Sequence, residues 1–162
     1  MKRIHIKRPH LKRASRSKKI GLAPGSVVYT GLKSDRDLKI DLIQYDANTV
    51  EEISDLKDSD CRSRTKKDKV TWFSINGLNK VNEIENIGSQ FSMNLLDVED
   101  LVNTAQRSSA SFNDDYVLVI MKLLSYNTDM ELKVEHANLV LFKDALLMFH
   151  ESENDFFNTV KD

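Results

Sequence analysis

The residues best suited to chemistry in this chain are three acids close together in one segment, Asp97, Glu99 and Asp100. The apolar residues among them recur at the i, i+3, i+7 spacing of a helix with one buried stripe: Leu95, Val98 and Val102. A helix that buries this stripe turns the acids toward solvent or a partner. Hard carboxylate oxygens on an exposed face are the ligands that Mg²⁺ or Ca²⁺ needs, so the segment is a candidate metal site.

The same acids also have a purely structural explanation. Asn94 is a good N-cap residue for this helix, and Asp97 follows it by three positions, as in a capping box. Acids near a helix N-terminus also offset the helix dipole. The residues alone therefore leave two interpretations open, a metal-binding face or a capped and solvated helix start.

Other arrangements of reactive residues are not apparent. The four histidines lack metal-ligand spacing, and neither a Gly-x-Ser-x-Gly nucleophile turn nor a glycine-rich phosphate loop occurs. Cys61 has no second cysteine to pair with, which fits a reducing compartment, and we interpret it as a passive thiol. We therefore predict no catalytic residues, no cofactor-binding residues and no enzyme.

The elements that must position the acids form an α+β pattern. Period-two alternation and β-branched runs predict strands. We predict helices at residues 81–91 and 95–104, from their helical spacing, and a further helix that starts at Asp155. Short turns cannot join parallel neighbours, so we expect a mixed, mostly antiparallel sheet flanked by helices, in α/β/α-type layers. The predicted strands are residues 26–30, 38–45, 49–54, 70–75, 116–126, 132–142 and 145–149.

Charge divides the chain into two parts. Residues 1–19 hold nine Lys and Arg and no acid, which leaves 24 − 9 = 15 basic against 25 acidic residues in the remainder. We predict a disordered basic arm over residues 1–22 and one domain over residues 23–162. The arm supports an alternative function, binding of nucleic acid, although the acidic body argues against a broad binding face. No apolar run is long enough for a membrane helix, so we expect a soluble, cytoplasmic domain.

Several segments, in this order, resemble the cytoplasmic domain of the CorA family of magnesium and cobalt transporters. Residues 24–31 (Pro-Gly-Ser-Val-Val-Tyr-Thr-Gly) resemble its opening strand, and residues 70–78 (Val-Thr-Trp-Phe-Ser-Ile-Asn-Gly-Leu) a strand and turn. Residues 84–91 resemble the following helix, and Asp114-Asp115-Tyr116 begins a matching strand. The family segment Leu-Glu-Asp-x-x-Asn-Thr-x-Gln-Arg is matched by Glu99, Asp100, Asn103, Thr104, Gln106 and Arg107.

This resemblance implies a function. It implies a regulatory domain of a Mg²⁺ or Co²⁺ channel, in which Mg²⁺ between neighbouring subunits holds the pore closed. Asp100 and Glu99 are then the metal ligands, and Asn103, Gln106 and Arg107 have structural or intersubunit roles. The longer protein would be a homopentamer whose domains lie on the cytoplasmic side of the cell membrane, anchored by segments absent from this chain. Alone, this chain would be a monomer or a weak oligomer, and it would bind Mg²⁺ weakly.

The chain also departs from the family pattern. The family has His-Gln-Arg-Pro where this chain has Ala105, Gln106, Arg107 and Ser108, and without proline the backbone after the helix is less restricted. Zinc-efflux proteins of the same family share the architecture. The resemblance therefore leaves the transported ion and the direction of transport open.

Overall fold

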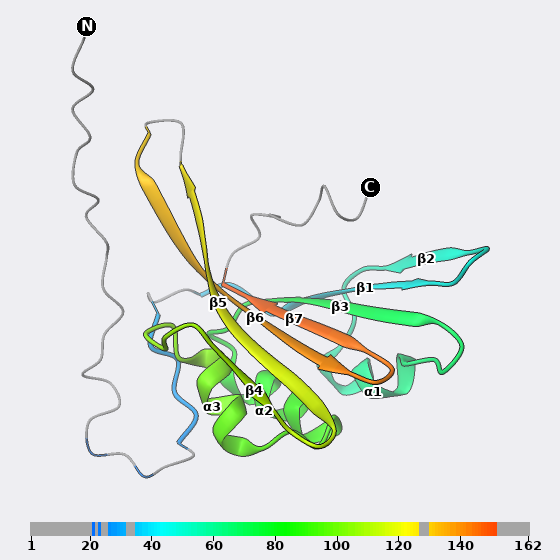
Figure 1. The fold of residues 1–162 in the computed structure, drawn as a ribbon, viewed down its shortest axis with the longest axis horizontal. Coiled ribbons are helices and arrows are strands. Elements are labelled where there is room, and N and C mark those ends of the chain that lie inside the picture. The colour runs from blue at the N-terminus through cyan, green and yellow to red at the C-terminus, as the bar shows by residue number, and fades with distance from the viewer. Residues whose placement is uncertain (1–20, 22, 24–25, 32–34, 127–129, 152–162) are drawn as a thin grey trace, which may run out of the picture.

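The computed structural model describes residues 21, 23, 26–31, 35–126 and 130–151. The predicted basic arm, apart from Gly21, and the helix that we predict from residue 155 onward lie outside the described residues. Within them, seven strands form one sheet in the order β2-β1-β3-β7-β6-β5-β4. Figure 1 shows this sheet above the helices. The strands are β1 (Lys39–Tyr45), β2 (Val50–Ile53), β3 (Val70–Asn76), β4 (Ser109–Phe112), β5 (Tyr116–Tyr126), β6 (Leu132–Phe142) and β7 (Leu146–His150).

The sheet is mixed, as the sequence predicts. β3 and β7 pair in parallel, and every other neighbouring pair is antiparallel. The parallel pair arises because the chain between β3 and β7 runs through two helices and the β4-β5-β6 strands before it returns to the centre of the sheet. The prediction of an α+β fold with a mostly antiparallel sheet is thus confirmed.

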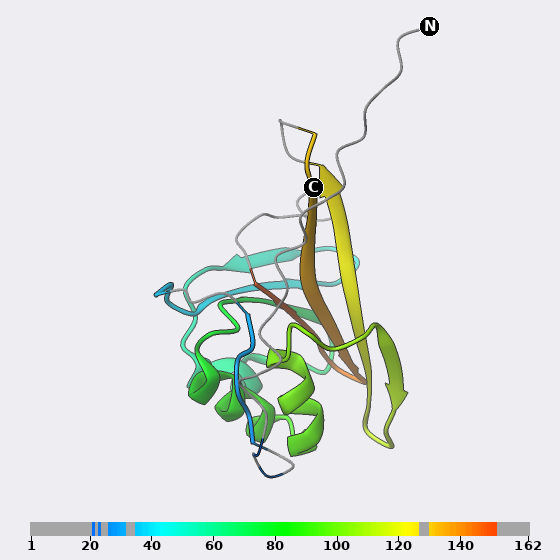
Figure 2. The ribbon, with the colours of Figure 1, turned by 90° about the vertical axis from the view of Figure 1, so that its left-hand side faces the viewer.

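The helices gather on one face of the sheet in all views (Figures 1 and 2). They are α1 (Cys61–Arg64), α2 (Val81–Gln90) and α3 (Leu95–Val102). In β5 the side chains that point into the core are those of Tyr116, Leu118 and Ile120. Val117 and Val119, which alternate with them along the strand, are only half-buried. No helix among the described residues is long and apolar enough to cross a membrane.

One apolar core joins the helices to this face. The α2 and α3 residues Ile84, Ile87, Val98 and Leu101 pack against strand residues, and all of these side chains are almost completely buried. At about 25 cal/mol for each Å² of apolar surface removed from water, this core is the main source of stability. The strand residues in the core are Ile40, Leu42, Phe73, Ile75, Leu118, Ile120, Val140, Leu147 and Phe149.

The strands differ from the prediction in two places. Residues 26–30, predicted as a strand, form neither helix nor strand. The backbone N–H of Thr30 donates instead to the carbonyl of Val102 at 3.4 Å, so this segment runs beside the end of α3. Conversely, β4 is a strand that we did not predict, and it pairs with β5 at the edge of the sheet.

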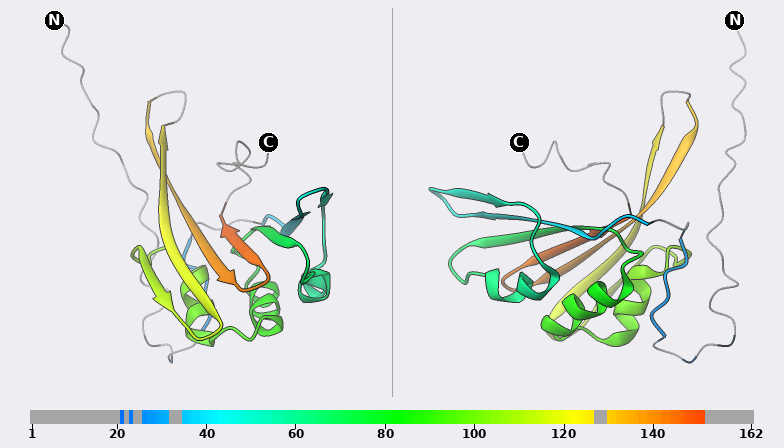
Figure 3. Two further views of the ribbon diagram at one scale, coloured as in Figure 1. Left: turned by 45° about the vertical axis from the view of Figure 1, so that its right-hand side comes forward. Right: turned by 180° about the vertical axis from the view of Figure 1, so that it is seen from behind.

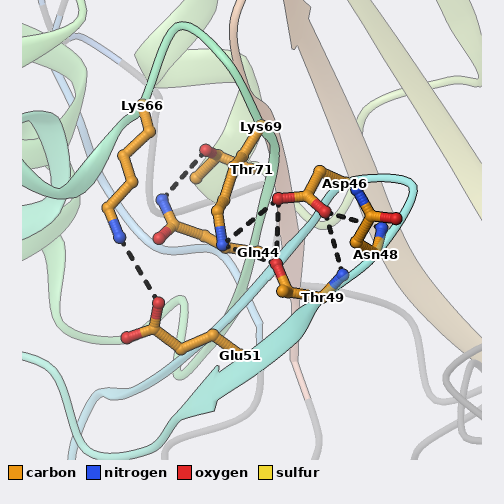
Figure 4. Close-up of polar contacts among 8 residues, drawn as sticks. All are labelled: Gln44, Asp46, Asn48, Thr49, Glu51, Lys66, Lys69 and Thr71. Carbon is orange, nitrogen blue, oxygen red and sulfur yellow. Dashed lines mark hydrogen bonds and ion pairs between the residues drawn. The ribbon is translucent and has the colours of Figure 1, made fainter.

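Both ends of the sheet carry hairpins. The β5-β6 hairpin extends past the other strands, as both views of Figure 3 show. At the opposite end, Asp46 closes the β1-β2 turn by accepting hydrogen bonds from the backbone N–H groups of Asn48 (2.7 Å) and Thr49 (2.9 Å). Lys69, just before β3, lies 3.6 Å from the Asp46 carboxylate, and Gln44 donates to the Thr71 hydroxyl at 3.1 Å (Figure 4). The turn is therefore fastened to β3.

Candidate metal site on the acidic helix

Helix α3 begins where the sequence predicts. The side chain of Asn94 accepts a hydrogen bond from the backbone N–H of Leu96 at 2.9 Å, which is N-cap geometry. Asp97 does not reach back to Asn94 itself. Its carboxylate accepts hydrogen bonds from the Tyr116 hydroxyl and from the Asn113 amide at 3.2 Å, so it fastens α3 to β5 and to the β4-β5 turn. These contacts give Asp97 a structural role.

The buried stripe of α3 differs in phase from the predicted one. Val98, Leu101 and Val102 are buried, whereas Leu95 is 52% exposed. Glu99 and Asp100 are half-buried at the border of the covered face. They thus lie within reach of solvent, as a cation site at a domain surface requires.

Asp100 is held by the turn that follows α3. The Gln106 side-chain amide donates to an Asp100 carboxylate oxygen at 2.9 Å, and the backbone N–H of Gln106 donates to the Asn103 carbonyl at 2.8 Å. The helix ends at Val102, two residues earlier than predicted, because the Asn103 N–H donates to the Asp100 carbonyl in a tighter turn. Three sequence-predicted residues, Asp100, Asn103 and Gln106, are therefore brought together.

Arg107 is not part of this group. Its side chain is exposed, two residues before β4, and it makes no ion pair within the described part of the chain. Arg107 therefore does not take part in the contacts that hold Asp100.

A partly buried polar cluster that we did not predict lies next to the turn. The ammonium of Lys122 (β5) donates to the Thr104 carbonyl at 2.6 Å and lies 2.7 Å from Nδ1 of His136 (β6). Burial, followed by the charge of Lys122, lowers the pKa of His136 to about 4, so this ring is neutral at neutral pH. Burial also lowers the pKa of Lys122. The sequence did carry a signal for this cluster, namely a lysine within an apolar strand that is followed by a strand containing a histidine.

The carboxylates fit only part of a metal site. Among the described residues, no three His, Cys, Asp or Glu side chains gather closely enough to hold an ion. Mg²⁺ keeps several waters and usually takes one or two protein carboxylates, so Glu99 and Asp100 fit such an ion as one side of a shared site. A preformed site for Zn²⁺, which takes four ligands, does not fit these residues.

A surface hollow of about 570 Å³ lies elsewhere, beyond the C-terminal end of α2. Its lining includes Phe91, the ion pair of Arg62 with Asp144, and two lysines, Lys67 and Lys143. The cations outnumber the acids in this lining, and neither Glu99 nor Asp100 belongs to it. The hollow is therefore not a second candidate for a cation site.

Known proteins with similar sequences define one family. The model of the CorA-like Mg²⁺ transporter protein family matches residues 67–162. The cobalt/magnesium transport protein CorA of Thermotoga maritima is 33% identical over 150 residues, which are 90% of this chain and 42% of that protein. The chain belongs to the CorA family. This family is one of transporters rather than enzymes, and membership does not favour the nucleic-acid-binding alternative.

Solved structures share the fold. The complete CorA magnesium transporter of Methanocaldococcus jannaschii aligns with a TM-score of 0.55 at 11% identity, over 75% of this chain and 35% of that one. The soluble domain of the same transporter gives a TM-score of 0.51 at 11% identity, over 74% and 44%. Full-length CmaX gives 0.56 at 8% identity, over 75% and 37%. The chain spans less than half the length of these relatives.

Proposed function

We propose that this chain is the ion-sensing domain of a longer CorA-type transporter of Mg²⁺ or Co²⁺, on the cytoplasmic side of the cell membrane. The observation that carries this proposal is the fixed position of Asp100 at the exposed border of α3, with its carboxylate held by Gln106 at 2.9 Å. Membership of the CorA family supports the same function. The segments that span the membrane would lie outside this chain.

Asp100, with Glu99 beside it, supplies this domain's share of a regulatory Mg²⁺ site. Carboxylates from two neighbouring subunits repel one another until a dication lies between them, so Mg²⁺ stabilises the assembly in which they face each other. When the Mg²⁺ concentration falls, the ion between the subunits dissociates and the open state of the pore becomes more populated. Gln106 and Asn103 orient Asp100, and the exposed Arg107 is available to a neighbouring subunit.

The assembly in the longer protein is a homopentamer in this proposal. A domain that offers only one side of each site has little to hold its neighbours when it is alone. We therefore expect this chain by itself to be a monomer or a weak oligomer that binds Mg²⁺ at about millimolar affinity or more weakly. Light scattering with and without Mg²⁺ measures this, and a stable pentamer of the isolated chain would contradict it.

The test of the metal site uses the full-length protein. Asp100→Asn removes one charge and keeps the hydrogen bond from Gln106, so the domain should fold unchanged. The Mg²⁺ concentration that half-protects the protein from protease should rise several-fold, and channel closure should shift in parallel. Asp68→Asn, which changes an exposed acid in the loop before β3, is the control. If both variants keep the unaltered Mg²⁺ dependence, the α3 acids are only surface charge and the proposed function fails.

A further inference from the structure

Two of the last carbonyl groups of α3 have hydrogen-bond partners on other elements. A helix end leaves four carbonyls without intrahelical partners, and these usually turn to water or to a capping glycine. Here the partners come from other elements. Asn138 on β6 donates to the Leu101 carbonyl at 3.0 Å, and the Thr30 N–H donates to the Val102 carbonyl at 3.4 Å. The helix end is thus fixed to the sheet and to the segment of residues 26–31.

Lys122 makes a further contact just beyond the end of α3. Its ammonium lies 2.6 Å from the Thr104 carbonyl, within the turn that leads from α3 to Gln106. A hydrogen bond from a charged donor is roughly twice as strong as a neutral one. Burial of an ammonium is costly unless its donors find partners. The carbonyl of Thr104 and the neutral ring of His136 are these partners.

The cluster continues on the other side of the turn. The Thr30 hydroxyl donates to the Asn103 side-chain oxygen at 3.1 Å, and the adjacent Tyr29 donates to Glu151 at 2.9 Å. Glu151 also accepts a bond from the backbone N–H of His136 at 3.4 Å and follows the last residue of β7. The turn is thus held from two directions, by Lys122 from the sheet and by Thr30 from the N-terminal segment.

We propose that Lys122 is a positioning residue for the acidic end of α3. It holds the turn of residues 103–106, this turn places Gln106, and Gln106 orients the Asp100 carboxylate. This inference rests on the proposed function, because Asp100 needs orientation only if it binds an ion. Loss of Lys122 removes the donor of the Thr104 carbonyl, and the turn then opens more often.

Two measurements on the full-length protein test this role. Lys122→Met keeps an unbranched, nearly as long apolar side chain and removes the ammonium. Lys143→Met makes the same change at an exposed lysine of the β6-β7 turn. Hydrogen exchange over residues 103–106 reports the turn directly, without any metal. The Mg²⁺ concentration for half-protection from protease reports the site. Thr30→Val, which removes the second support of the turn, serves if Lys122→Met does not fold.

We expect Lys122→Met to speed exchange over residues 103–106 by about tenfold, as for loss of one strong hydrogen bond. It should also raise the Mg²⁺ concentration for half-protection from protease several-fold. Adding Asp100→Asn should raise this concentration no further, since both changes act on one site. Lys143→Met should change neither the exchange rate of residues 103–106 nor the Mg²⁺ concentration for half-protection.

The outcomes that overturn the inference differ from those that overturn the function. Unchanged exchange in Lys122→Met shows that Lys122 does not hold the turn. Faster exchange with an unchanged midpoint, while Asp100→Asn does shift it, shows that the turn does not position Asp100. If Asp100→Asn shifts no midpoint, the proposed function itself fails and the contact of Lys122 with the turn remains only structural.

Discussion

The hydroxyl of Tyr116 lies 2.5 Å from a carboxylate oxygen of Asp97, and the same hydroxyl accepts a hydrogen bond from the backbone N–H of Asn94 at 3.0 Å. In an ordinary capping box the acid would bind that N–H directly. Here a side chain from β5 stands between them. The start of α3 is therefore defined by the sheet as well as by its own sequence, and the candidate metal helix has fixed attachments at both ends.

Replacement of Tyr116 by Phe should destabilise the domain by about 1–2 kcal/mol. The variant keeps the buried ring, but the Asn94 N–H loses its acceptor and the Asp97 carboxylate loses its short bond. Urea unfolding followed by fluorescence measures the change. Tyr126→Phe is the matched control, since Tyr126 is 65% exposed. Equal urea midpoints for Tyr116→Phe and Tyr126→Phe would show that water replaces the Tyr116 hydroxyl without loss of stability.

Burial of Cys61 predicts a pH dependence of stability. Burial, followed by the charges of Asp58 and Asp60, raises the pKa of this thiol from 9.0 to about 12. Because the folded-state pKa is the higher one, the contribution to stability is complete below pH 9.0 and is lost as pH rises toward 12. Cys61→Ala should therefore make the free energy of unfolding fall less steeply from about pH 8 to about pH 11.

The same burial makes the thiol unreactive at neutral pH. Native protein should react with a thiol reagent far more slowly than unfolded protein, because the thiolate is the reactive form. Rapid labelling under native conditions, or an unchanged pH slope in Cys61→Ala, would contradict the buried position. The burial of Cys61, the first residue of α1, agrees with our interpretation of it as a passive thiol.

Strands with strong apolar patterns could be predicted from the sequence, and strands formed by pairing alone could not. β5 has the predicted bounds, Tyr116–Tyr126, because an apolar run lies between two clusters of turn residues. β4 consists of Ser109–Phe112, which are small or fully exposed, and it is a strand only because β5 offers it an edge. Residues 26–30 have strand-like composition, yet the Thr30 N–H bonds to α3 instead.

The candidate site, too, could be predicted only where its residues follow a local sequence pattern. Acids at the start of a helix are visible in a sequence, and Glu99 and Asp100 were found in this way. The bond from Gln106 to Asp100 joins residues six apart, beyond any helical spacing, since the helix ends between them. The contact of Lys122 with His136 depends on the register of β5 and β6, which places the two residues opposite each other.

The β1-β2 turn predicts a different pH response. Hydrogen bonds from Asn48 and Thr49 are the main cause that lowers the pKa of Asp46 to about 2. Because the folded-state pKa is depressed, its contribution is present above the ordinary value of 3.8 and is lost as pH falls toward 2. Asp46→Ala should speed hydrogen exchange of the Thr49 amide at neutral pH, and the difference from the unaltered protein should shrink in acid. Asp68→Ala, at an exposed acid before β3, should have no such effect.

Gly88 of α2 packs against Val98 of α3, so an added methyl group at Gly88 should clash with Val98. A second substitution, at Val98, should relieve the clash. A Cβ on Gly88 would lie 2.6 Å from Cγ2 of Val98, nearer than packed atoms come. Alanine favours helix over glycine by up to about 1 kcal/mol, but overpacking in a core costs about 1–3 kcal/mol. Gly88→Ala should therefore lower the free energy of unfolding, whereas Ser89→Ala, at the exposed neighbouring position, should not. Truncation of Val98 removes the clashing methyl group. In the Val98→Ala background, adding Gly88→Ala should thus be neutral or stabilising, and an equal loss in both backgrounds would show that the helices do not meet at Gly88.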